Sequence, residues 1–263
     1  MSRQIAGKAL GLGLGLIYGW LPGALIGLLI GHWFDKRQTA VMASQARSEG
    51  LLNPAMEDGL QQSTFTIGVI VLGAKMAKAD GRVSHEEIAA FRRVFRVPDD
   101  QVAQVGNLFD QARLSADGYE PYAARLAQVF RAKPAVLEEI LTGLFLVAVA
   151  DSVGLSRAES IFLRRVATLF GFSVEEYARI AASSGIRLPD QPAAPRNEAY
   201  AVLGLPETAS AAEIKRTYRV LIRKHHPDKL VAEGLPPEMI AQANEKMKRI
   251  NAAYDSLCKA KGI

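Results

Sequence analysis

The chain has 263 residues, enough for one or two globular units that each bury a core of their own. Its formal net charge is +5 at pH 7, a mild positive excess that is compatible with an acidic protein, a nucleic acid or a membrane surface as partner. A single cysteine, Cys258, excludes a disulfide within the chain, and no nucleophile–base relay or phosphate-binding glycine loop is present. We therefore expect a binding protein rather than an enzyme.

The N-terminal part contains a long apolar stretch. Residues 9–31 include no Lys, Arg, Asp, Glu or His. As a helix they would span roughly 34 Å, enough for the hydrocarbon core of a bilayer. The stretch ends in Gly-His-Trp-Phe-Asp-Lys-Arg rather than in a small-residue cleavage site, which favours a retained anchor over a cleaved signal peptide. We predict a short tail at residues 1–8 and a transmembrane helix at residues 9–31.

Glycine is periodic in this stretch. Seven glycines recur every fourth residue and would share one face of the helix: Gly7, Gly11, Gly15, Gly19, Gly23, Gly27 and Gly31. Small residues in such a register let helix backbones approach closely in lipid. The alternative is that glycine is simply frequent in membrane helices. We predict that the glycine face from Gly11 to Gly31 forms a homodimer contact.

A juxtamembrane connector is expected at residues 32–58, followed by a helical region at residues 59–184. Apolar residues in this region recur at intervals of three and four, and continuous strand alternation is absent. Pro134 fits the first position of a helix. The stripes include Phe65, Val69, Leu72 and Met76, then Ile88, Phe91, Val94 and Phe95, then Val136, Leu137, Ile140, Leu141, Leu144 and Val147, and finally Ile161, Leu163, Val166, Ala167 and Phe170. The fold class predicted for the whole chain is all-α.

An internal repeat lies within the helical region. Residues 79–87 and 150–159 both contain an acidic turn that ends in Ser-x-x-Glu, the capping-box pattern that opens a helix. The competing hypothesis is a carboxylate site for a metal, with Asp80, Glu87, Asp151 and Glu159 as candidates, although Arg82 occupies a ligand position of an EF-hand loop. Capping is favoured. The Asp-Gly-x-Val-Ser segment at residues 80–84 resembles TerB-like domains, which implies an all-α module.

A proline-rich segment at residues 185–196 follows. Pro189, Pro192 and Pro195 lie close together, which is typical of a semi-rigid spacer. We expect this linker to separate two independently foldable units.

The C-terminal region, residues 197–263, contains a basic helix from Ala211 to His225. Ser210 and Glu213 form its capping box. Its charge comes from Lys215, Arg216, Arg219, Arg223 and Lys224. A basic helix is also compatible with binding to nucleic acid or to a membrane surface, but this one lacks groove-reading polar residues and stacking aromatics. We predict a protein partner and no nucleic acid.

The basic helix ends at His226-Pro227-Asp228. Pro227 cannot continue the helix, so a constrained loop is expected to present His226 and Asp228. A metal site made of His225, His226 and Asp228 would lack a companion cluster of ligands, and no metal or cofactor is predicted. A further helix from Pro237 is expected to run antiparallel to the basic helix, leaving the loop at the tip of the hairpin.

Several separated motifs in this region resemble a J-domain. They are residues 197–205 (Asn-Glu-Ala-Tyr-Ala-Val-Leu-Gly-Leu), residues 210–219, His226-Pro227-Asp228-Lys229 and Ile250-Asn-Ala-Ala-Tyr254. The resemblance implies a co-chaperone that stimulates ATP hydrolysis by a DnaK-type chaperone, with ATP and Mg²⁺ bound by that chaperone. The residues it assigns to chaperone binding are His226, Pro227, Asp228, Lys215, Arg216, Arg219, Arg223, Lys224 and Lys229.

The order of membrane helix, helical region, linker and J-domain resembles the DjlA-type membrane-anchored J-domain proteins of bacteria. Residues 27–32 and 225–239 are the local matches. The resemblance implies a single-pass protein of the bacterial inner membrane. Because a DnaK-type partner is cytosolic, the N-terminus is expected in the periplasm and residues 35–263 in the cytoplasm. The alternative is a membrane-bound sensing or scaffold protein whose helical middle region binds a metal or a partner.

Overall fold

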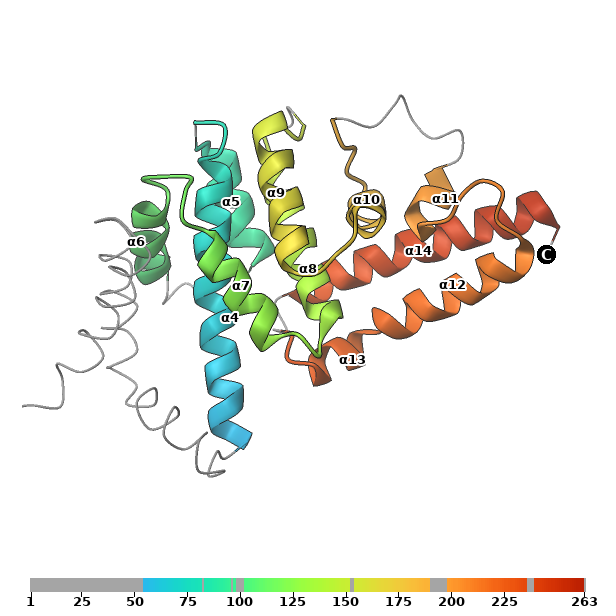
Figure 1. The fold of residues 1–263 in the computed structure, drawn as a ribbon, viewed down its shortest axis with the longest axis horizontal. Helices are drawn as coiled ribbons and strands as arrows, with labels where there is room; N and C mark the ends of the chain where they lie inside the picture. Colours follow the sequence, from blue (N-terminus) through green and yellow to red (C-terminus); the bar gives the residue numbers. More distant parts are fainter. Residues whose placement is uncertain are drawn as a thin grey trace, which may run out of the picture.

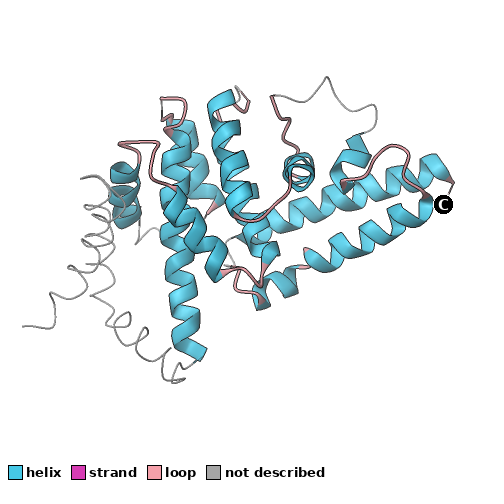
Figure 2. Cartoon of the chain, viewed as in Figure 1, coloured by secondary structure: helices cyan, strands magenta, loops and turns pink. Residues whose placement is uncertain are grey.

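The computed structural model describes residues 54–81, 83–95, 97, 102–151, 154–189, 198–235 and 239–262. Every regular element in these ranges is a helix, which confirms the all-α prediction (Figure 2). None of the described helices is both long and apolar enough to cross a membrane. The predicted transmembrane helix at residues 9–31 and its glycine face lie outside the described residues, as does the connector up to residue 53.

The helices fall into a middle unit, residues 54–189, and a C-terminal unit, residues 198–262 (Figure 1). The middle unit contains α4 (Pro54–Ala77), α5 (His85–Val94), α6 (Val102–Ala112), α7 (Glu120–Val129), α8 (Pro134–Ala148), α9 (Arg157–Leu169) and α10 (Val174–Ser183). The C-terminal unit contains α11 (Glu198–Leu203), α12 (Ala211–Lys224), α13 (Pro227–Ala232) and α14 (Ile240–Lys261).

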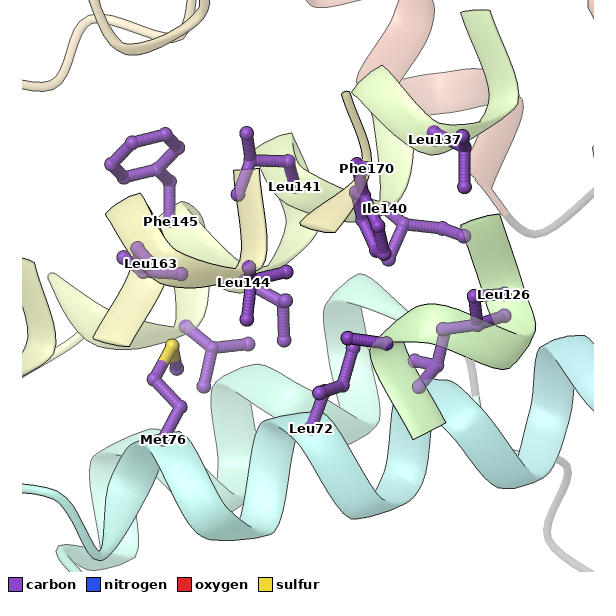
Figure 3. Packing of buried hydrophobic residues seen from close by; sticks show 14 of the residues in the cluster. Leu72, Met76, Leu126, Leu137, Ile140, Leu141, Leu144, Phe145, Leu163 and Phe170 are labelled. Atoms are coloured by element: carbon purple, nitrogen blue, oxygen red, sulfur yellow. The ribbon is translucent and has the colours of Figure 1, made fainter. Parts of the chain in front are cut away.

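Helix α8 forms the centre of the middle unit. Nearly all of its side chains are buried, because α4, α5, α9 and α10 all contact it. Figure 3 shows Leu144 of α8 pointing toward Leu72 and Met76 of α4, with Leu163 of α9 nearby. A helix that is apolar all round belongs in a core rather than at a surface. The predicted stripes are therefore core residues, except that Ile161 is 62% exposed and points away from the core.

The predicted helix starts are confirmed at atomic detail. Pro134 occupies the first turn of α8. Ser84 and Ser156 each receive a backbone N–H at the start of α5 and α9, while Glu87 and Glu159 accept the N–H of those serines at 2.8 and 2.9 Å. Each pair satisfies two N–H groups that have no partner inside the helix. Both halves of the internal repeat are thus capped helix starts.

The C-terminal unit is a helical hairpin with α11 laid across it. Helices α12 and α14 run side by side in opposite directions (Figure 1), as the sequence predicted. The rings of Tyr218 and Tyr254 stack 3.9 Å apart with an angle of 7° between them. Tyr200, Ile214 and Leu257 lie in the small core that α11, α12 and α14 share.

The two units share a buried boundary, although the proline-rich segment predicted a spacer between them. Leu230 of α13 and Met239, next to α14, belong to the same buried apolar cluster as the core of the middle unit. Helix α11 also packs on α10. The first part of the predicted linker contributes to that cluster as well, since Ile186 and Leu188 are buried in it. The end of the hairpin that carries the His-Pro-Asp motif is therefore built into the middle unit.

Candidate interaction site around the His-Pro-Asp motif

Helix α12 positions the basic residues. Its start is fixed by a capping box in which Glu213 accepts the N–H of Ser210 at 2.7 Å, and the Ser210 hydroxyl accepts the N–H of Glu213 at 3.3 Å. The hydrogen bonds from Ser210 lower the pKa of Glu213 below its ordinary value. Ile214 and Leu221 are buried and hold the helix against α14. One face of α12 is thereby fixed and the opposite face is left outward.

That outward face carries most of the predicted partner-binding cations. Arg216, Arg219 and Arg223 are exposed, while Lys215 is half-buried. Arg223 Nε donates to the carbonyl of Arg219 at 3.2 Å, which keeps the two side chains on the same stretch of surface. Val220 lies among them and is 51% exposed. Cations around an apolar residue form a surface suited to an acidic protein partner.

The His-Pro-Asp motif adopts a different backbone from the predicted loop. Helix α12 ends at Lys224, and Pro227 then opens the short helix α13 at its first turn, where its missing N–H is not needed. His226 caps α13, and its Nδ1 accepts the N–H of Asp228 at 3.2 Å. The predicted end of the basic helix is confirmed, but the constrained loop expected after it is only the short break at His225 and His226, because Pro227 begins another helix.

The motif itself faces outward. The side chains of His226 and Asp228 are 50% and 93% exposed, with Nδ1 and Oδ2 3.8 Å apart. Lys229 is exposed and pairs with Glu233 at 3.4 Å. Pro227 is half-buried. Such an arrangement offers a rigid contact point to another protein.

His225, directly before the motif, is fully buried at the boundary between the units. Its Nδ1 lies 3.1 Å from Glu139 Oε1, and its Nε2 lies 3.1 Å from Glu138 Oε1, in ion-pair range although outside hydrogen-bond geometry. Both glutamates belong to α8 of the middle unit. The residue before His226 is therefore held between two carboxylates of the other unit.

Glu138 is the centre of this buried network. Arg179 of α10 donates two hydrogen bonds to it, at 3.0 and 2.8 Å, in a fork. Lys246 of α14 donates to Oε1 at 3.1 Å, and Lys224 of α12 pairs with Oε2 at 2.7 Å with 21% of its side chain exposed. Lys224, which was predicted to contact the partner, is thus engaged by the middle unit.

Glu139 completes the network. Lys246 donates to its Oε1 at 2.9 Å, and Gln242 donates to its backbone carbonyl at 2.7 Å. Lys246 is therefore shared by both glutamates, with 1% of its side chain exposed. Every charge in this buried site has a partner of opposite sign, as buried charges require.

The electrostatics of the two carboxylates follow from these contacts. Burial would raise the pKa of Glu138, but the charges of His225, Lys246 and Arg179 outweigh it and hold that pKa well below its ordinary value. For Glu139, burial is likewise outweighed, mainly by Lys246 and His225, and the pKa is lowered. Both carboxylates are ionised at neutral pH, which keeps the network charged.

Apart from Lys224, the residues of this network are not among the site residues that the sequence predicts. The signal was nevertheless present, because Glu138 and Glu139 stand side by side in an otherwise apolar stretch from Pro134 to Ala148. Charged residues in a buried helix are expected to be paired. Their partner Lys246 lies 108 residues further along the chain from Glu138, so the pairing itself had no local signature.

Two acidic residues of the internal repeat lie at helix starts. Glu87 and Glu159 are used in capping, and burial raises the pKa of Glu87 to about 7. Across the ranges that the structure describes, no three His, Cys, Asp or Glu side chains gather closely enough to hold a metal ion.

Comparison with known proteins covers all parts of the chain. Three family descriptions match: "Co-chaperone DjlA transmembrane domain" at residues 1–53, "Tellurite resistance protein TerB" at residues 66–182 and "DnaJ domain" at residues 198–262. No solved structure matches the chain. The three matches agree with the predicted order of a transmembrane segment, a TerB-like region and a J-domain.

Curated relatives named "Co-chaperone protein DjlA" match over most of the length. The Coxiella burnetii protein is 34% identical over 216 residues, covering 78% of this chain and 80% of the relative. The Photobacterium profundum protein is 33% identical over 259 residues, covering 89% and 90%. The Vibrio cholerae protein is 58% identical over 66 residues, a quarter of this chain. With a transmembrane, a TerB and a DnaJ segment in this order, the chain belongs to the DjlA family of J-domain proteins.

Proposed function

We propose that this chain is a membrane-anchored co-chaperone that stimulates ATP hydrolysis by a DnaK-type chaperone and recruits it to clients or regulators at the bacterial inner membrane. The outward face of α12 would dock on an acidic surface of that chaperone, which sets association rate and orientation by charge complementarity. His226, Pro227 and Asp228 would then favour its hydrolysis-competent state. That effect is a coupling between sites rather than catalysis by this chain.

The observation that carries the proposal is the placement of the motif. His226 and Asp228 are exposed, with His226 at the N-cap of α13 and Asp228 in its first turn, and Arg219 and Arg223 lie exposed on the adjoining helix. A motif with a fixed backbone next to a cationic surface can bind an acidic partner without rearranging first. No catalytic group or bound cofactor has to be invoked.

The test is single-turnover ATP hydrolysis by DnaK in the presence of the full chain. We expect His226→Gln to abolish stimulation, because the contact at the motif is lost while α12 and its charges remain. His85→Gln is the matched control, since His85 is also exposed at a helix start but lies on α5. If His226→Gln stimulates like the unaltered chain, the co-chaperone proposal is wrong.

We further propose that the N-terminus lies in the periplasm and residues 35–263 in the cytoplasm. The flanking cations decide little, because two precede the apolar stretch and three follow it: Arg3 and Lys8, then Lys36, Arg37 and Arg47. The proposed partner determines the orientation, because DnaK and ATP are cytosolic and the J-domain must lie on the same side of the membrane. A phosphatase fused to the C-terminus should be inactive, and activity in the periplasm would contradict this orientation.

A homodimer through the transmembrane segment is proposed from the glycine register. Two J-domains on one assembly would raise their local concentration near a shared client. Gly19→Leu with Gly23→Leu should abolish crosslinking between copies of residues 1–40 in membranes. Gly13→Leu with Ala24→Leu adds nearly as much bulk, one carbon less, at positions outside the register and should leave crosslinking intact. Equal crosslinking in both variants would show that the glycine face is not the contact.

A further inference from the structure

We propose that Glu138 and Glu139 of the middle unit are positioning residues for the His-Pro-Asp motif: by holding His225 and Lys246 they fix the C-terminal unit in one orientation. The middle unit then helps to orient the motif toward the chaperone. This inference rests on the proposed function and assigns to it two residues outside the J-domain.

His225 is held by α8 at both of its ring nitrogens. Both ring nitrogens lie 3.1 Å from carboxylate oxygens of α8, and the side chain is fully buried. His225 is also the last cap residue of α12 and directly precedes His226, the cap of α13. A side chain held at two points leaves its own backbone little freedom. The peptide that enters the motif is thereby fixed relative to α8.

The network spans three helices that contribute to the boundary. Lys224 reaches Glu138 from the end of α12, Lys246 reaches both glutamates from α14, and Arg179 reaches Glu138 from α10. Buried ion pairs add little net stability, but their geometry is demanding, so they select one arrangement among apolar contacts of similar energy. The network thus acts on orientation more than on stability.

The boundary extends beyond the network through two contacts between an arginine side chain of one unit and a glycine of the other. Gly204, at the end of α11, has a φ of +70° and would place a Cβ 2.7 Å from Arg179 Cδ. Gly185, after α10, has a φ of +75° and would place a Cβ 2.4 Å from Arg249 Nη1. Each arginine lies against the glycine of the other unit. A side chain of each unit thus reaches the backbone of the other unit.

This docking leaves the motif accessible. His226 and Asp228 remain exposed, as do Arg216, Arg219 and Arg223. The side of the hairpin end that meets the middle unit carries His225, held by α8, and Leu230, buried in the core cluster of that unit. The middle unit therefore supports the motif from behind and does not mask it.

The test compares orientation and stimulation in the full chain held in lipid nanodiscs. In a Cys258→Ser background, spin labels are placed at the exposed positions Thr168→Cys on α9 and Ala212→Cys on α12. The unaltered boundary should give one narrow distance distribution by pulsed electron paramagnetic resonance. The double variant Glu138→Gln with Glu139→Gln should give a broad one.

Stimulation of DnaK is measured on the same samples. The maximal stimulation should fall at least about fivefold, a typical size for coupling between sites. The half-saturating concentration should stay the same, because the exposed face of α12 is untouched. A lower maximal stimulation at an unchanged half-saturating concentration distinguishes a positioning role from a loss of binding. A general structural defect would change both.

Controls keep the result decisive. Glu86→Gln with Glu175→Gln removes two exposed carboxylates from the same unit and should change neither readout. If the double variant in α8 fails to fold, Gln242→Ala is used instead, since it leaves every charge in place and removes the hydrogen bonds from Gln242 to the Glu139 carbonyl and to Glu139 Oε2. It should broaden the distribution and lower stimulation to a smaller extent.

Three outcomes would overturn the inference: a narrow distribution in the variants, a broad one with unchanged stimulation, or a broad one with increased stimulation. Failure of the proposed function is recognised separately. In that case His226→Gln leaves stimulation unchanged, whereas the distance distributions, measured without DnaK, still report whether α8 fixes the orientation.

Discussion

At the scale of single residues, His225 and His226 stand side by side and face opposite environments. His225 is fully buried between Glu138 and Glu139, whereas the side chain of His226 is 50% exposed and accepts only a local hydrogen bond from Asp228. The reversal arises because α12 ends between them and α13 begins. One histidine thus anchors the motif and the next is free to contact a partner.

Glu87 gives a residue-scale prediction about pH. Burial raises its pKa from an ordinary 4.5 to about 7. The folded protein therefore binds more protons than the unfolded chain between those values, and the free energy of unfolding falls as pH rises from 4.5 to 7. Glu87→Gln keeps the capping box but removes this fall, and should stabilise the chain at pH 8 by on the order of 1 kcal/mol.

Urea unfolding at several pH values measures this effect. Glu86→Gln is the control, because Glu86 is exposed in the same turn of α5. Unfolding free energies of Glu87→Gln that decline as steeply as those of the unaltered chain would show that Glu87 is not the titrating group.

Gly204 gives a second prediction at this scale. Its φ of +70° disfavours any side chain, and a Cβ would also meet Arg179. Gly204→Ala should therefore lower the free energy of unfolding by more than Gly171→Ala, which has a φ of +87° but open space around it. The difference isolates the contact with Arg179 from backbone strain, which costs roughly 1–3 kcal/mol in both variants. Equal losses would mean that Arg179 moves aside freely.

At the scale of elements, local sequence predicted most helices but not α13. Apolar stripes and Ser-x-x-Glu caps located α5, α8, α9 and α12 because both signals act within a few residues. Pro227 was interpreted only as a stop, since proline is excluded from helix interiors yet favoured at the first turn. What decides between these roles is the burial of Leu230 against the middle unit, a contact that the local sequence does not show.

The outward face of α12 gives the prediction for this scale. Arg219→Glu with Arg223→Glu reverses two exposed charges about one turn apart and leaves the buried face intact. The association rate of this variant with DnaK should be lower than that of the unaltered chain. Binding of the unaltered chain to DnaK should weaken as salt is added. Surface plasmon resonance over a range of ionic strengths measures both.

Arg92→Glu with Arg93→Glu, on exposed positions of α5, is the matched control and should not alter association. Binding that is insensitive to salt would argue against docking through α12. Tighter binding of RNA or anionic vesicles than of DnaK would favour a nucleic acid or a membrane surface as the partner of α12.

At the scale of the whole molecule, the sequence predicted the order of the parts but not their contact. The prolines of residues 185–196 indicate a spacer, and nothing local reveals that Ile186 and Leu188 are buried on one side of it. The boundary depends on pairs such as Glu139 and Lys246, 107 residues apart, whose proximity is a property of the folded chain. A single sequence shows such residues only as unexplained charges in apolar helices.

The shared boundary predicts cooperative opening. Because Leu230 lies in the same buried cluster as α8, amide protons of α13 should exchange with the same free energy as those of α8. In Glu138→Gln with Glu139→Gln the two values should separate, with α13 opening more readily. Hydrogen exchange followed by mass spectrometry measures both. Early exchange of α13 in the unaltered chain would show that the units open independently.

The contact between α10 and α11 also has a consequence for chain connectivity. These helices flank the connection at residues 184–197, so the two helix ends that it joins are held in one packed unit whenever the units are docked. Docking then resembles closure of a loop, whose entropic cost rises only by about 0.6 kcal/mol for each doubling of length. Insertions into residues 190–197 should therefore leave the docked state populated. Evolution could vary the length of this segment freely while the orientation of the motif stays fixed.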